Sequence, residues 1–417
     1  MKRVIVVGGG FGGLNAAKAL GSKPGIEVLL LDRQNHHLFQ PLLYQVAMAG
    51  LDPGDIATPI RTLLSKHQNV SVLMTDVQKV DLTNRTVQTD FASFDYDYLI
   101  LACGAQHSYF GHDDWEPFAP GLKSLEQAVE IRRRVLTAFE LAERETDSER
   151  VRQLLTFIVI GGGPTGVELA GSLGEITRYA LSSDFRHIDP SQARIILIEA
   201  GQRILATFEP RLSQRAARDL ENLGVTVWTG ARVTKVDEDG VSLGTEKVKS
   251  NTVLWAAGVK PSSLNATLET PLDKSGRIIV GPDLSIAGHP HVFVLGDQAH
   301  FEQDGVPLPG LAPVAIQQGR WVAKLIVADL KGTIRKTFRY RDKGQMATIG
   351  RRRAVAQTKN FKFTGTTAWF AWLLVHIYFL IGFKNRVVVL FEWFWSYLTF
   401  KRGTRLITRR GWMSQQS

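Results

Sequence analysis

The chain has 417 residues, which is too long for one ordinary hydrophobic core, so two or three domains are expected. Its composition, 44% hydrophobic and 22% charged, is that of a globular protein rather than a disordered one. The single cysteine, Cys103, excludes an intramolecular disulfide framework, a C-x-x-C redox pair and an iron–sulfur or zinc thiolate site.

The net charge of +10 is unevenly distributed along the chain. Residues 331–417 hold 18 Lys and Arg against two acidic residues, which leaves 32 basic and 38 acidic residues of the totals of 50 and 40 for the preceding part. A mildly acidic body with a strongly basic C-terminal region indicates contact with a polyanionic surface, either nucleic acid or acidic lipid.

The start of the chain predicts a strand, a glycine turn and a helix. The apolar residues 4–7 run into G-x-G-x-x-G, formed by Gly8, Gly10 and Gly13, which is the dinucleotide-binding fingerprint. The first glycine permits a tight turn, the second lets a pyrophosphate approach the backbone, and the third lets helix and strand pack closely. The phosphates then bind at the helix N-terminus. Because the chain enters this strand directly, we expect no signal peptide and synthesis in the cytoplasm.

A second strand, residues 26–31, ends in Asp32, at about the 20-residue spacing where a carboxylate holds a ribose hydroxyl. Residues 35–45 mix histidines, amides and apolar residues without a clear period, which favours a loop or short helix beside a site. Its two histidines have no metal partners, so no metal site is predicted. A buried strand at 98–102 then ends in a turn of small residues, where we expect Cys103 to be an unreactive core thiol.

The fingerprint recurs in the middle of the chain. The apolar residues 154–160 lead to Gly161, Gly163 and Gly166, a helix follows, and the next strand ends in Glu199. An acid at that place hydrogen-bonds the 2′-hydroxyl of NAD and repels the 2′-phosphate of NADP. The recurrence of the whole unit predicts that two dinucleotides are bound.

The two halves are internal duplicates, because residues 250–259 repeat the design of an apolar strand followed by Ala-x-Gly that is found at 98–105. A further short strand, 291–295, ends in Gly296 and Asp297. Together these features resemble the two-dinucleotide-binding-domain flavoprotein reductases. The resemblance implies FAD in the first unit and NAD(P)H in the second, inserted unit, with Asp297 at the ribityl–phosphate region of the flavin.

Finer signals favour one branch of that superfamily. The cysteine pair of disulfide reductases and the flavin-side cysteines of sulfide:quinone reductases are both missing from this sequence. Residues 312–319 look like the quinone-site signature of type II NADH dehydrogenases, and 338–344 with 347–351 match the start of that family's C-terminal domain. Pro313 departs from the family's usual glutamine, so only the role of Gln317 carries over. The family also places the glutamate at position 168 near the flavin.

The predicted fold class is α/β, with two Rossmann-like dinucleotide-binding domains, the NAD domain inserted into the FAD domain, and a C-terminal membrane-associating region of mixed α+β and helical structure. The expected boundaries are 1–150 for the first part of the FAD-binding domain, 151–275 for the NADH-binding domain, 276–337 for the second part of the FAD-binding domain, and 338–417 for the C-terminal domain with amphipathic membrane-anchoring helices.

Residues 363–383 form a run of 21 residues without a charge, which is long enough to span a bilayer. However, threonines at one end and His376 in the middle shorten the strongly apolar part to about 13 residues, which favours an interfacial or buried helix. Insertion of this run and mere contact with the membrane both remain open.

The next run, up to residue 400, predicts an amphipathic helix with a narrow polar face. Its polar residues, Asn385, Glu392, Ser396 and Thr399, are spaced by seven, four and three positions and share one helical face. The remaining surface is aliphatic and aromatic, and cations follow at 401, 402, 405, 409 and 410. Residues 368–410 are therefore predicted to anchor the protein to an anionic membrane surface. The alternative is burial against the body or a partner subunit. Nucleic acid is a poorer fit than lipid because so much apolar surface does not suit phosphates, so no nucleic-acid partner is predicted.

The resemblance implies a respiratory-chain enzyme that passes two electrons from NADH through FAD to a membrane quinone without pumping protons. We expect it at the cell membrane, peripheral and on the cytoplasmic side, with homodimerisation as a family-level expectation. Two alternatives are a soluble NAD(P)H-dependent FAD reductase of a protein acceptor such as ferredoxin, and a non-catalytic redox sensor. The identity of the quinone and the strictness of the preference for NADH over NADPH stay open.

The candidate site residues follow from the motifs and the resemblance. We expect Glu168 to relay protons and Gln317 to orient a quinone carbonyl. The residues predicted to bind FAD are Gly8, Gly10, Phe11, Gly12, Gly13, Asp32, Gly104, Asp297 and Ala315; those for NADH are Gly161, Gly163, Thr165, Gly166, Glu199 and Gly258; those for quinone are Gln317, Gln318 and Lys384; no metal ligand is predicted.

Overall fold

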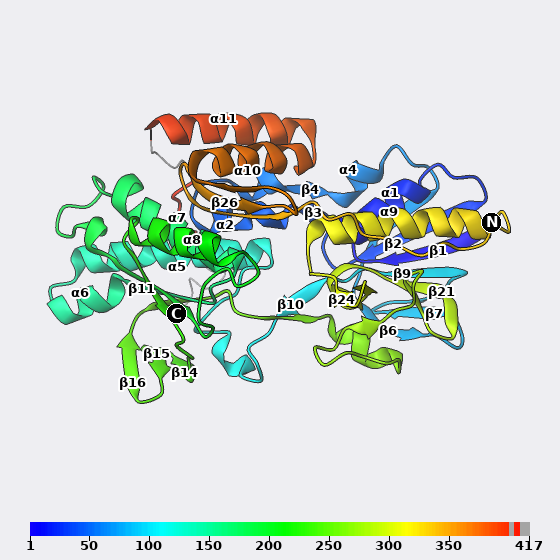
Figure 1. Cartoon of the computed structure of the whole chain (residues 1–417), viewed down its shortest axis with the longest axis horizontal. Coiled ribbons are helices and arrows are strands. Elements are labelled where there is room, and N and C mark those ends of the chain that lie inside the picture. The colour runs from blue at the N-terminus through cyan, green and yellow to red at the C-terminus, as the bar shows by residue number, and fades with distance from the viewer. Residues whose placement is uncertain (400–403, 409–417) are drawn as a thin grey trace. The chain divides into compact units, whose positions relative to one another are not determined.

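The computed structural model describes residues 1–399 and 404–408 and divides into two compact units (Figure 1). Unit 1 consists of Met1–Leu38, Ala57–Gln106 and Val259–Lys343; unit 2 consists of Phe39–Ile56, His107–Gly258 and the chain from Gly344 onward. Each unit contains its own parallel sheet and its own glycine loop, so the predicted α/β class with two Rossmann-like sheets is confirmed. The boundaries expected for the individual domains stay predictions.

The main sheet of unit 1 has its glycine strand in the centre. Its six strands run in the order β20 (Ser285–Ile286), β21 (His289–Val294), β9 (Tyr98–Leu101), β1 (Lys2–Val7), β2 (Ile26–Asp32) and β5 (Val70–Met74). Strand β1 pairs in parallel with β2 and β9, and all four residues of β9 are buried. An antiparallel sheet of β6 (Val77–Asp81), β7 (Thr86–Thr89) and β8 (Ser93–Asp95) shares the same apolar core.

Two long helices of unit 1 lie side by side, α1 (Phe11–Leu20) and α9 (Ala312–Asp329) (Figure 1). They approach closely because both present glycine at the crossing: a Cβ on Gly319 would lie 2.2 Å from the carbonyl oxygen of Gly12. This contact brings the quinone-site signature, 312–319, against the first glycine loop.

Unit 2 repeats the arrangement. Its sheet runs β13 (Val225–Thr229), β12 (Arg194–Glu199), β11 (Thr156–Ile160) and β17 (Thr252–Trp255), with α5 (Leu125–Arg144), α6 (Ser148–Leu154), α7 (Pro164–Glu175) and α8 (Pro210–Glu221) in the same unit. Strand β11 pairs in parallel with β12 and β17 as β1 does with β2 and β9. A small antiparallel sheet of β14 (Lys235–Asp237), β15 (Gly240–Leu243) and β16 (Glu246–Lys249) follows, as β6–β8 does in unit 1. The predicted internal duplication is confirmed.

The C-terminal region packs on the nucleotide-binding helices of unit 2. Strands β25 (Gln345–Gly350), β26 (Arg353–Gln357) and β27 (Lys362–Thr364) form an antiparallel sheet. Strand β25 lies directly on α7, because a Cβ on Gly171 would lie 1.8 Å from the carbonyl oxygen of Ile349. Any larger side chain at position 171 would push the sheet away from the helix.

Two helices complete unit 2, α10 (Gly365–Phe379) and α11 (Phe383–Thr399), and they form a hairpin. The turn uses Gly382 with φ of 93°, a conformation that favours glycine. The Arg386 guanidinium donates to the carbonyls of Tyr378 (2.9 Å) and Leu380 (2.7 Å), which satisfies groups left open at the end of α10. Helix α10 has 15 residues, and none of the helices in the described ranges is both long and apolar enough to cross a bilayer.

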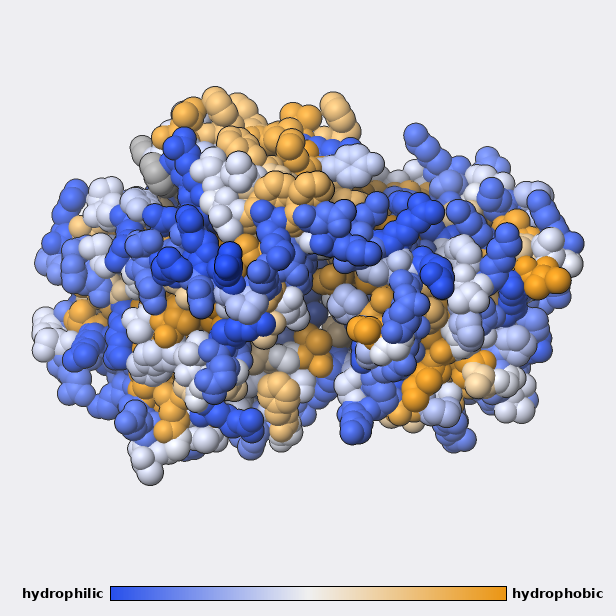
Figure 2. All heavy atoms as spheres, viewed as in Figure 1, coloured by the Kyte–Doolittle hydropathy of each residue, from blue (hydrophilic) through white to orange (hydrophobic). Residues whose placement is uncertain are grey.

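The polar residues predicted to share one face of α11 are all half-buried, while large apolar side chains face solvent. The Asn385 amide donates to the Gly54 carbonyl (3.4 Å), and Trp393 Nε1 donates to Gln45 Oε1 (2.7 Å). The exposed apolar side chains of the hairpin are Phe370, Leu374, Val375, Tyr378, Phe379, Phe383, Val387, Leu390, Phe391, Phe394, Trp395 and Leu398, and we call this surface the apolar hairpin face. Figure 2 shows the hydrophobic surface over α10 and α11.

Candidate active site

The first glycine loop has the geometry of a phosphate cradle. Gly8 has φ of 99°, and a Cβ on Gly13 would lie 1.8 Å from the Gly8 carbonyl oxygen, so neither position tolerates a side chain. By contrast, a Cβ on Gly10 would meet no atom within 4 Å. Gly10 is the N-cap of α1 and no side chain caps that helix. The loop therefore leaves open space at the N-terminus of α1, whose first N–H groups have no partner within the helix, and this fits a pyrophosphate.

Asp32 holds this loop in place. Its Oδ2 accepts the backbone N–H of Gly9 (2.5 Å), and its Oδ1 accepts that of Gln34 (2.7 Å). Desolvation by burial raises the pKa of Asp32 despite these hydrogen bonds. The residue also lines a groove of about 560 Å³ together with Gly8, Cys103 and Ser262. The carboxylate thus lies where a ribose would be held, and it shapes the loop as well. Burial raises the pKa of the Cys103 thiol to about 12, in keeping with the unreactive role expected of it.

The second glycine loop repeats the first. Gly161 has φ of 109°, and a Cβ on Gly166 would lie 1.8 Å from its carbonyl oxygen, whereas Gly163 faces open space. Glu199 Oε2 accepts the N–H of Gly162 (2.6 Å), and its Oε1 accepts that of Gly201 (2.6 Å). This is the contact that Asp32 makes with the first loop.

The remaining residues predicted for the two nucleotides lie at the loops and turns of these sheets. Thr165 is exposed in the first turn of α7. Gly104 and Gly258 follow the strands β9 and β17, with φ of 69° and 76°. A Cβ on Gly8 would lie 2.4 Å from the Ala102 carbonyl oxygen, so the Ala-x-Gly turn of unit 1 packs against its glycine loop. In unit 2, a Cβ on Gly161 would correspondingly lie 2.7 Å from the Ala256 carbonyl oxygen.

The Gly296–Asp297 turn borders the same space as the first loop. A Cβ on Gly296 would lie 3.1 Å from the Ala315 Cβ, and a Cβ on Gly12 would lie 3.5 Å from the Ala315 carbonyl oxygen. The half-buried Asp297 carboxylate accepts no hydrogen bond from any described residue. A cradle with open space at a helix N-terminus, bordered by the Asp297 carboxylate, fits FAD in unit 1.

His37 is a residue at this site to which the sequence analysis gave no role. It is buried, its Nδ1 donates to the Gly9 carbonyl (2.9 Å), and its ring meets the Phe11 ring edge-on at 5.2 Å. Burial lowers the pKa of His37 to about 4, so the ring is neutral. Within the described residues its Nε2 has no partner, which leaves a buried acceptor beside the cofactor cradle. The sequence predicted a loop or short helix beside a site here, but the structure places His37 in the short strand β3 (His36–Leu38).

The two glutamines of the signature segment have different environments. Gln318 is buried at 1% exposure, and its Oε1 accepts the backbone N–H of Gly296 (2.7 Å), so it shapes the Gly-Asp turn. This contact gives no support to its predicted contact with quinone. Gln317 is half-buried and forms two hydrogen bonds with the backbone of Arg341, each 3.0 Å. A paired amide has a fixed orientation, and its predicted role towards quinone stays a prediction.

Glu168 lies on α7 and accepts the backbone N–H of Thr348 from β25. The residue is half-buried, but its carboxyl is largely desolvated, which raises its pKa to about 8. The carboxyl therefore carries a proton at neutral pH and is able to donate it. Lys384, the third residue predicted for quinone, is exposed at the start of α11, where its charge acts on Asp55 of α3 (Pro53–Ile56).

Two parallel sheets with matching glycine loops and carboxylates, together with a Gly-Asp turn, define a reductase that binds two dinucleotides. Residues 2–319 match the pyridine nucleotide-disulphide oxidoreductase family, and residues 343–402 match the NDH2 C-terminal domain. The type II NADH:quinone oxidoreductases Ndh and NdhA of Mycobacterium tuberculosis are 46% and 43% identical, over 97% of this chain and 90% and 89% of theirs. The chain belongs to the type II NADH:quinone oxidoreductase family, as the sequence resemblance implied.

The solved structures agree on the fold. NDH2 from Plasmodium falciparum in complex with NADH superimposes with a TM-score of 0.88 at 19% identity, covering 98% of this chain and 100% of that chain. A ferredoxin reductase from Rhodopseudomonas palustris reaches 0.66 at 20% identity, over 83% of this chain and 79% of that chain. The fold of the described residues, those of the C-terminal region included, is therefore that of the NDH2 structure.

We expect Glu199→Gln to raise the KM for NADH at least tenfold, because a charge-assisted hydrogen bond to a ribose is worth about 1.5–3 kcal/mol and about 1.4 kcal/mol is a factor of ten. The loss of the negative charge should also lower the KM for NADPH. Steady-state kinetics with both nucleotides measures the two effects. Asp32→Asn is the matched control, because it removes the equivalent charge in unit 1 and should reduce FAD content without changing the ratio of the two KM values. An unchanged ratio in Glu199→Gln would contradict the assignment.

Proposed function

We propose that this chain catalyses NADH + H⁺ + quinone → NAD⁺ + quinol, with FAD as the resident cofactor and a membrane quinone as acceptor. The observation that carries the proposal is the combination, in one chain, of two duplicated nucleotide cradles with a C-terminal hairpin that exposes a large apolar face. The names of the relatives from Mycobacterium tuberculosis, both NADH:quinone oxidoreductases, support it.

Bound FAD supplies the two-electron chemistry, and the protein supplies position and electrostatics. In unit 1, the loop at Gly10, with Phe11, Gly12 and Gly13 in the first turn of α1, holds the pyrophosphate. Asp32 holds the adenosine ribose, and Asp297 holds the ribityl–phosphate region. Gly104 leaves room at the end of β9, and Ala315 lies beside the flavin.

In unit 2, Gly163, Thr165 and Gly166 hold the NADH phosphates at the N-terminus of α7, and Gly258 leaves room at the end of β17. Glu199 holds the 2′-hydroxyl of NADH and repels the 2′-phosphate of NADPH. On the acceptor side, Gln317, its amide fixed by the backbone of Arg341, orients a quinone carbonyl.

Glu168 is the proton donor to quinone. The overall reaction takes up one proton from solution in each turnover. A carboxyl with a pKa of about 8 is mostly protonated at pH 7, and general acid catalysis is most effective when the pKa lies near the working pH. The enzyme is proposed to transfer electrons without pumping protons, as the resemblance to type II NADH dehydrogenases implies.

We further propose that the apolar hairpin face lies in the membrane interface, on the cytoplasmic side of the cell membrane, as a peripheral anchor. Its exposed residues include Leu374 at 73%, Tyr378 at 71% and Phe391 at 64% exposure. Monomeric soluble proteins rarely expose so large a continuous apolar patch on their surface. Of the cations predicted to bind anionic lipid, Arg405 instead donates to the Ala180 carbonyl (2.8 Å) and pairs with Asp184. Residues 401, 402, 409 and 410 lie outside the described residues, and a homodimer stays a family-level expectation.

The alternative of a soluble ferredoxin reductase is less well supported. Such a reductase matches with a lower TM-score, 0.66 against 0.88, and the relatives with the highest identity carry quinone in their names. A docking site for an acidic protein would also need exposed cations rather than the aromatic residues found on α10 and α11.

The test of the function is anaerobic addition of NADH, and separately NADPH, to the purified protein, followed by a short-chain quinone. We expect NADH to abolish the flavin absorbance within seconds and quinone to restore it. NADPH should be much slower, because of Glu199. Reduction by NADH without recovery on adding quinone would refute the quinone assignment, and recovery only with a ferredoxin would favour the alternative.

The pKa of Glu168 predicts the pH dependence of the quinone half-reaction. Its protonated form is present below pH 8 and is lost as the pH rises, so the rate should fall about tenfold per unit well above pH 8. Glu168→Gln should lower the rate about a hundredfold and flatten this profile. The NADH half-reaction in the same variant is the internal control. A profile that persists in Glu168→Gln would assign the titration to another group.

Membrane contact is tested by Leu374→Glu and Phe394→Glu, which place charges on the apolar hairpin face. We expect each change to weaken flotation with anionic liposomes at least tenfold, because a charge in the apolar part of a membrane costs about 2.5 kcal/mol or more. Ile334→Glu is the control, since that side chain is 92% exposed and lies outside the hairpin. Equal flotation of all three variants would place the anchor elsewhere.

A further inference from the structure

A loop of unit 2 places an exposed aromatic side chain at the end of strand β17. The loop comprises residues 108–112, and the Phe110 side chain in it is 67% exposed. A Cβ on Gly258, in the turn that follows β17, would lie 2.4 Å from Phe110 Cζ and 3.1 Å from both Cε atoms. The edge of the ring therefore lies directly on the Gly258 backbone and fills the space that this glycine leaves.

Contacts with β17 and the turn after it hold this loop in place. The Ser108 N–H donates to the Gly258 carbonyl (3.4 Å), and Trp255 Nε1 donates to the Ser108 carbonyl (3.0 Å). The Ser108 hydroxyl accepts the N–H of Phe110 (3.3 Å). The buried Tyr109 ring packs on the Trp255 ring, with 4.9 Å between their centroids. The position of the Phe110 ring therefore follows from the packing of the loop on the end of β17.

Phe110 has a backbone conformation that a bulky residue does not favour. Its φ is 54° and that of Gly111 is 93°, and the His112 N–H donates to the Tyr109 carbonyl (3.1 Å). Positive φ at both central residues is the pattern of a type I′ turn, in which Asn and Gly are preferred. Side chains held against such a cost cluster at functional sites. Because an exposed ring gains little from burial, stability does not explain a phenylalanine at this position.

The topology of the unit 2 sheet brings the nicotinamide end of NADH to the same turn. The strand order is β13, β12, β11, β17, so β12 and β17 lie on opposite sides of the glycine strand β11. In the proposed function Glu199 of β12 holds the adenosine ribose, and the loop after β11 holds the pyrophosphate. A dinucleotide bound across the carboxyl ends of these strands continues from there towards β17 with its nicotinamide half. Gly258 and Phe110 lie at that end of the site.

We propose that Phe110 binds the nicotinamide ring of NADH by packing its own ring against it. The inference rests on the proposed function, in which unit 2 holds NADH, and it adds the contact that orients the reacting end of the nucleotide. Glu199 and the glycine loop hold parts of NADH that are also present in ADP-ribose, so they do not orient the nicotinamide. An aromatic neighbour adds a stacking contact and restricts a flat ring to a few orientations.

The test is anaerobic flavin reduction by NADH in the full-length, FAD-loaded protein carrying Phe110→Ala, followed by stopped-flow absorbance. We expect the NADH concentration that gives half the maximal rate to rise about tenfold, the effect of deleting one base–aromatic stack. ADP-ribose, which lacks only the nicotinamide, competes with NADH in the same experiment, and its inhibition constant should not change. Glu199→Gln should weaken the binding of both molecules, because both contain the adenosine ribose.

Two further variants separate the ring from the loop that carries it. Phe110→Tyr keeps an aromatic ring and should keep the half-saturating NADH concentration of the unmodified protein. Phe110→Gly removes the ring and suits a positive φ, so it should weaken NADH binding as Phe110→Ala does without lowering the melting temperature. A role in stability alone predicts the reverse, a lower melting temperature with unchanged discrimination between NADH and ADP-ribose.

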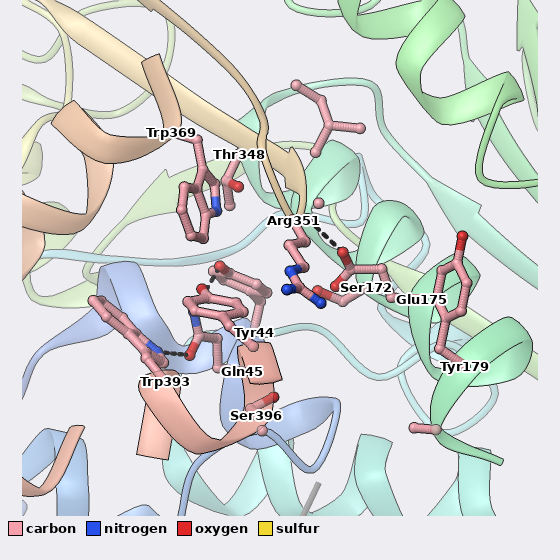
Figure 3. A pocket seen from close by; sticks show the side chains of 15 residues that line it. Tyr44, Gln45, Ser172, Glu175, Tyr179, Thr348, Arg351, Trp369, Trp393 and Ser396 are labelled. Carbon is pink, nitrogen blue, oxygen red and sulfur yellow. Dashed lines mark hydrogen bonds between the residues drawn. The ribbon is translucent and has the colours of Figure 1, made fainter. Parts of the chain in front are cut away.

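Two exposed aromatic residues away from β17 provide the controls. Phe91 of unit 1 is 64% exposed, and Tyr179 of unit 2 is 46% exposed. Tyr179 lines a cavity of about 700 Å³ together with residues of α7, the turn after β25 and α11 (Figure 3). It follows the C-terminal end of α7, a helix of 12 residues and therefore about 18 Å long, whereas the second glycine loop lies at the N-terminal end. Phe91→Ala and Tyr179→Ala should bind NADH as the unmodified protein does.

Two results would overturn the role of Phe110. One is an unchanged half-saturating NADH concentration in Phe110→Ala, and the other is an equal loss of NADH and ADP-ribose binding, which would mean that the loop only supports the fold of the site. Failure of NADH to reduce the flavin of the unmodified protein would instead overturn the proposed function.

Discussion

The hydrogen bond from a glycine-loop N–H to the carboxylate at the end of the neighbouring strand is the constraint on which both nucleotide sites depend. Strands β1 and β2 pair in parallel with Val7 opposite Leu31, so their carboxyl ends meet at one edge of the sheet. Asp32, the next residue, then reaches the N–H of Gly9. Strands β11 and β12 place Ile160 opposite Ile198, and Glu199 reaches Gly162 in the same way. A carboxylate that already holds the loop presents its remaining lone pairs to a ribose in a fixed direction.

A second constraint joins the C-terminal region to the nucleotide fold of unit 2. Because Gly171 has no side chain, the backbone of β25 lies directly on α7. The strand therefore reaches Glu168 with a backbone N–H, and the turn after it reaches Glu175. Residues nearly 180 positions apart in the sequence thus build one wall of polar groups. The C-terminal sheet thus holds both carboxyls of α7 by backbone hydrogen bonds, besides being the base of the hairpin.

The features that could be predicted from the sequence are those set by residue spacing within one or two neighbouring elements. The glycine loops, the carboxylates at positions 32 and 199 and the polar face of α11 each follow from spacing within one or two elements, and the structure reproduces that spacing. Periodicity does not reveal which partner a polar side chain selects. Gln317 and Gln318 are adjacent, yet one pairs with the backbone of Arg341 and the other with Gly296. The environments of Tyr44 and His37 likewise depend on contacts that exist only in the folded chain, such as the hydrogen bond of His37 to the Gly9 carbonyl.

The distribution of polar and apolar side chains around α11 determines which side of the helix packs on unit 2 and which side faces solvent. In an ordinary surface helix the apolar side packs on the core, but here Asn385 and Trp393 use polar atoms to bind Gly54 and Gln45. Those hydrogen bonds, together with the buried side chains of Val389 and Trp393, fix which side of α11 faces unit 2, and most of the other large aromatic side chains of the helix face solvent. Each 100 Å² of that surface withdrawn from water contributes about 2.5 kcal/mol. A few partly inserted aromatic side chains are then sufficient to hold the proposed membrane face in place. Arg405 is engaged with Asp184, so this attachment depends on apolar area more than on that charge.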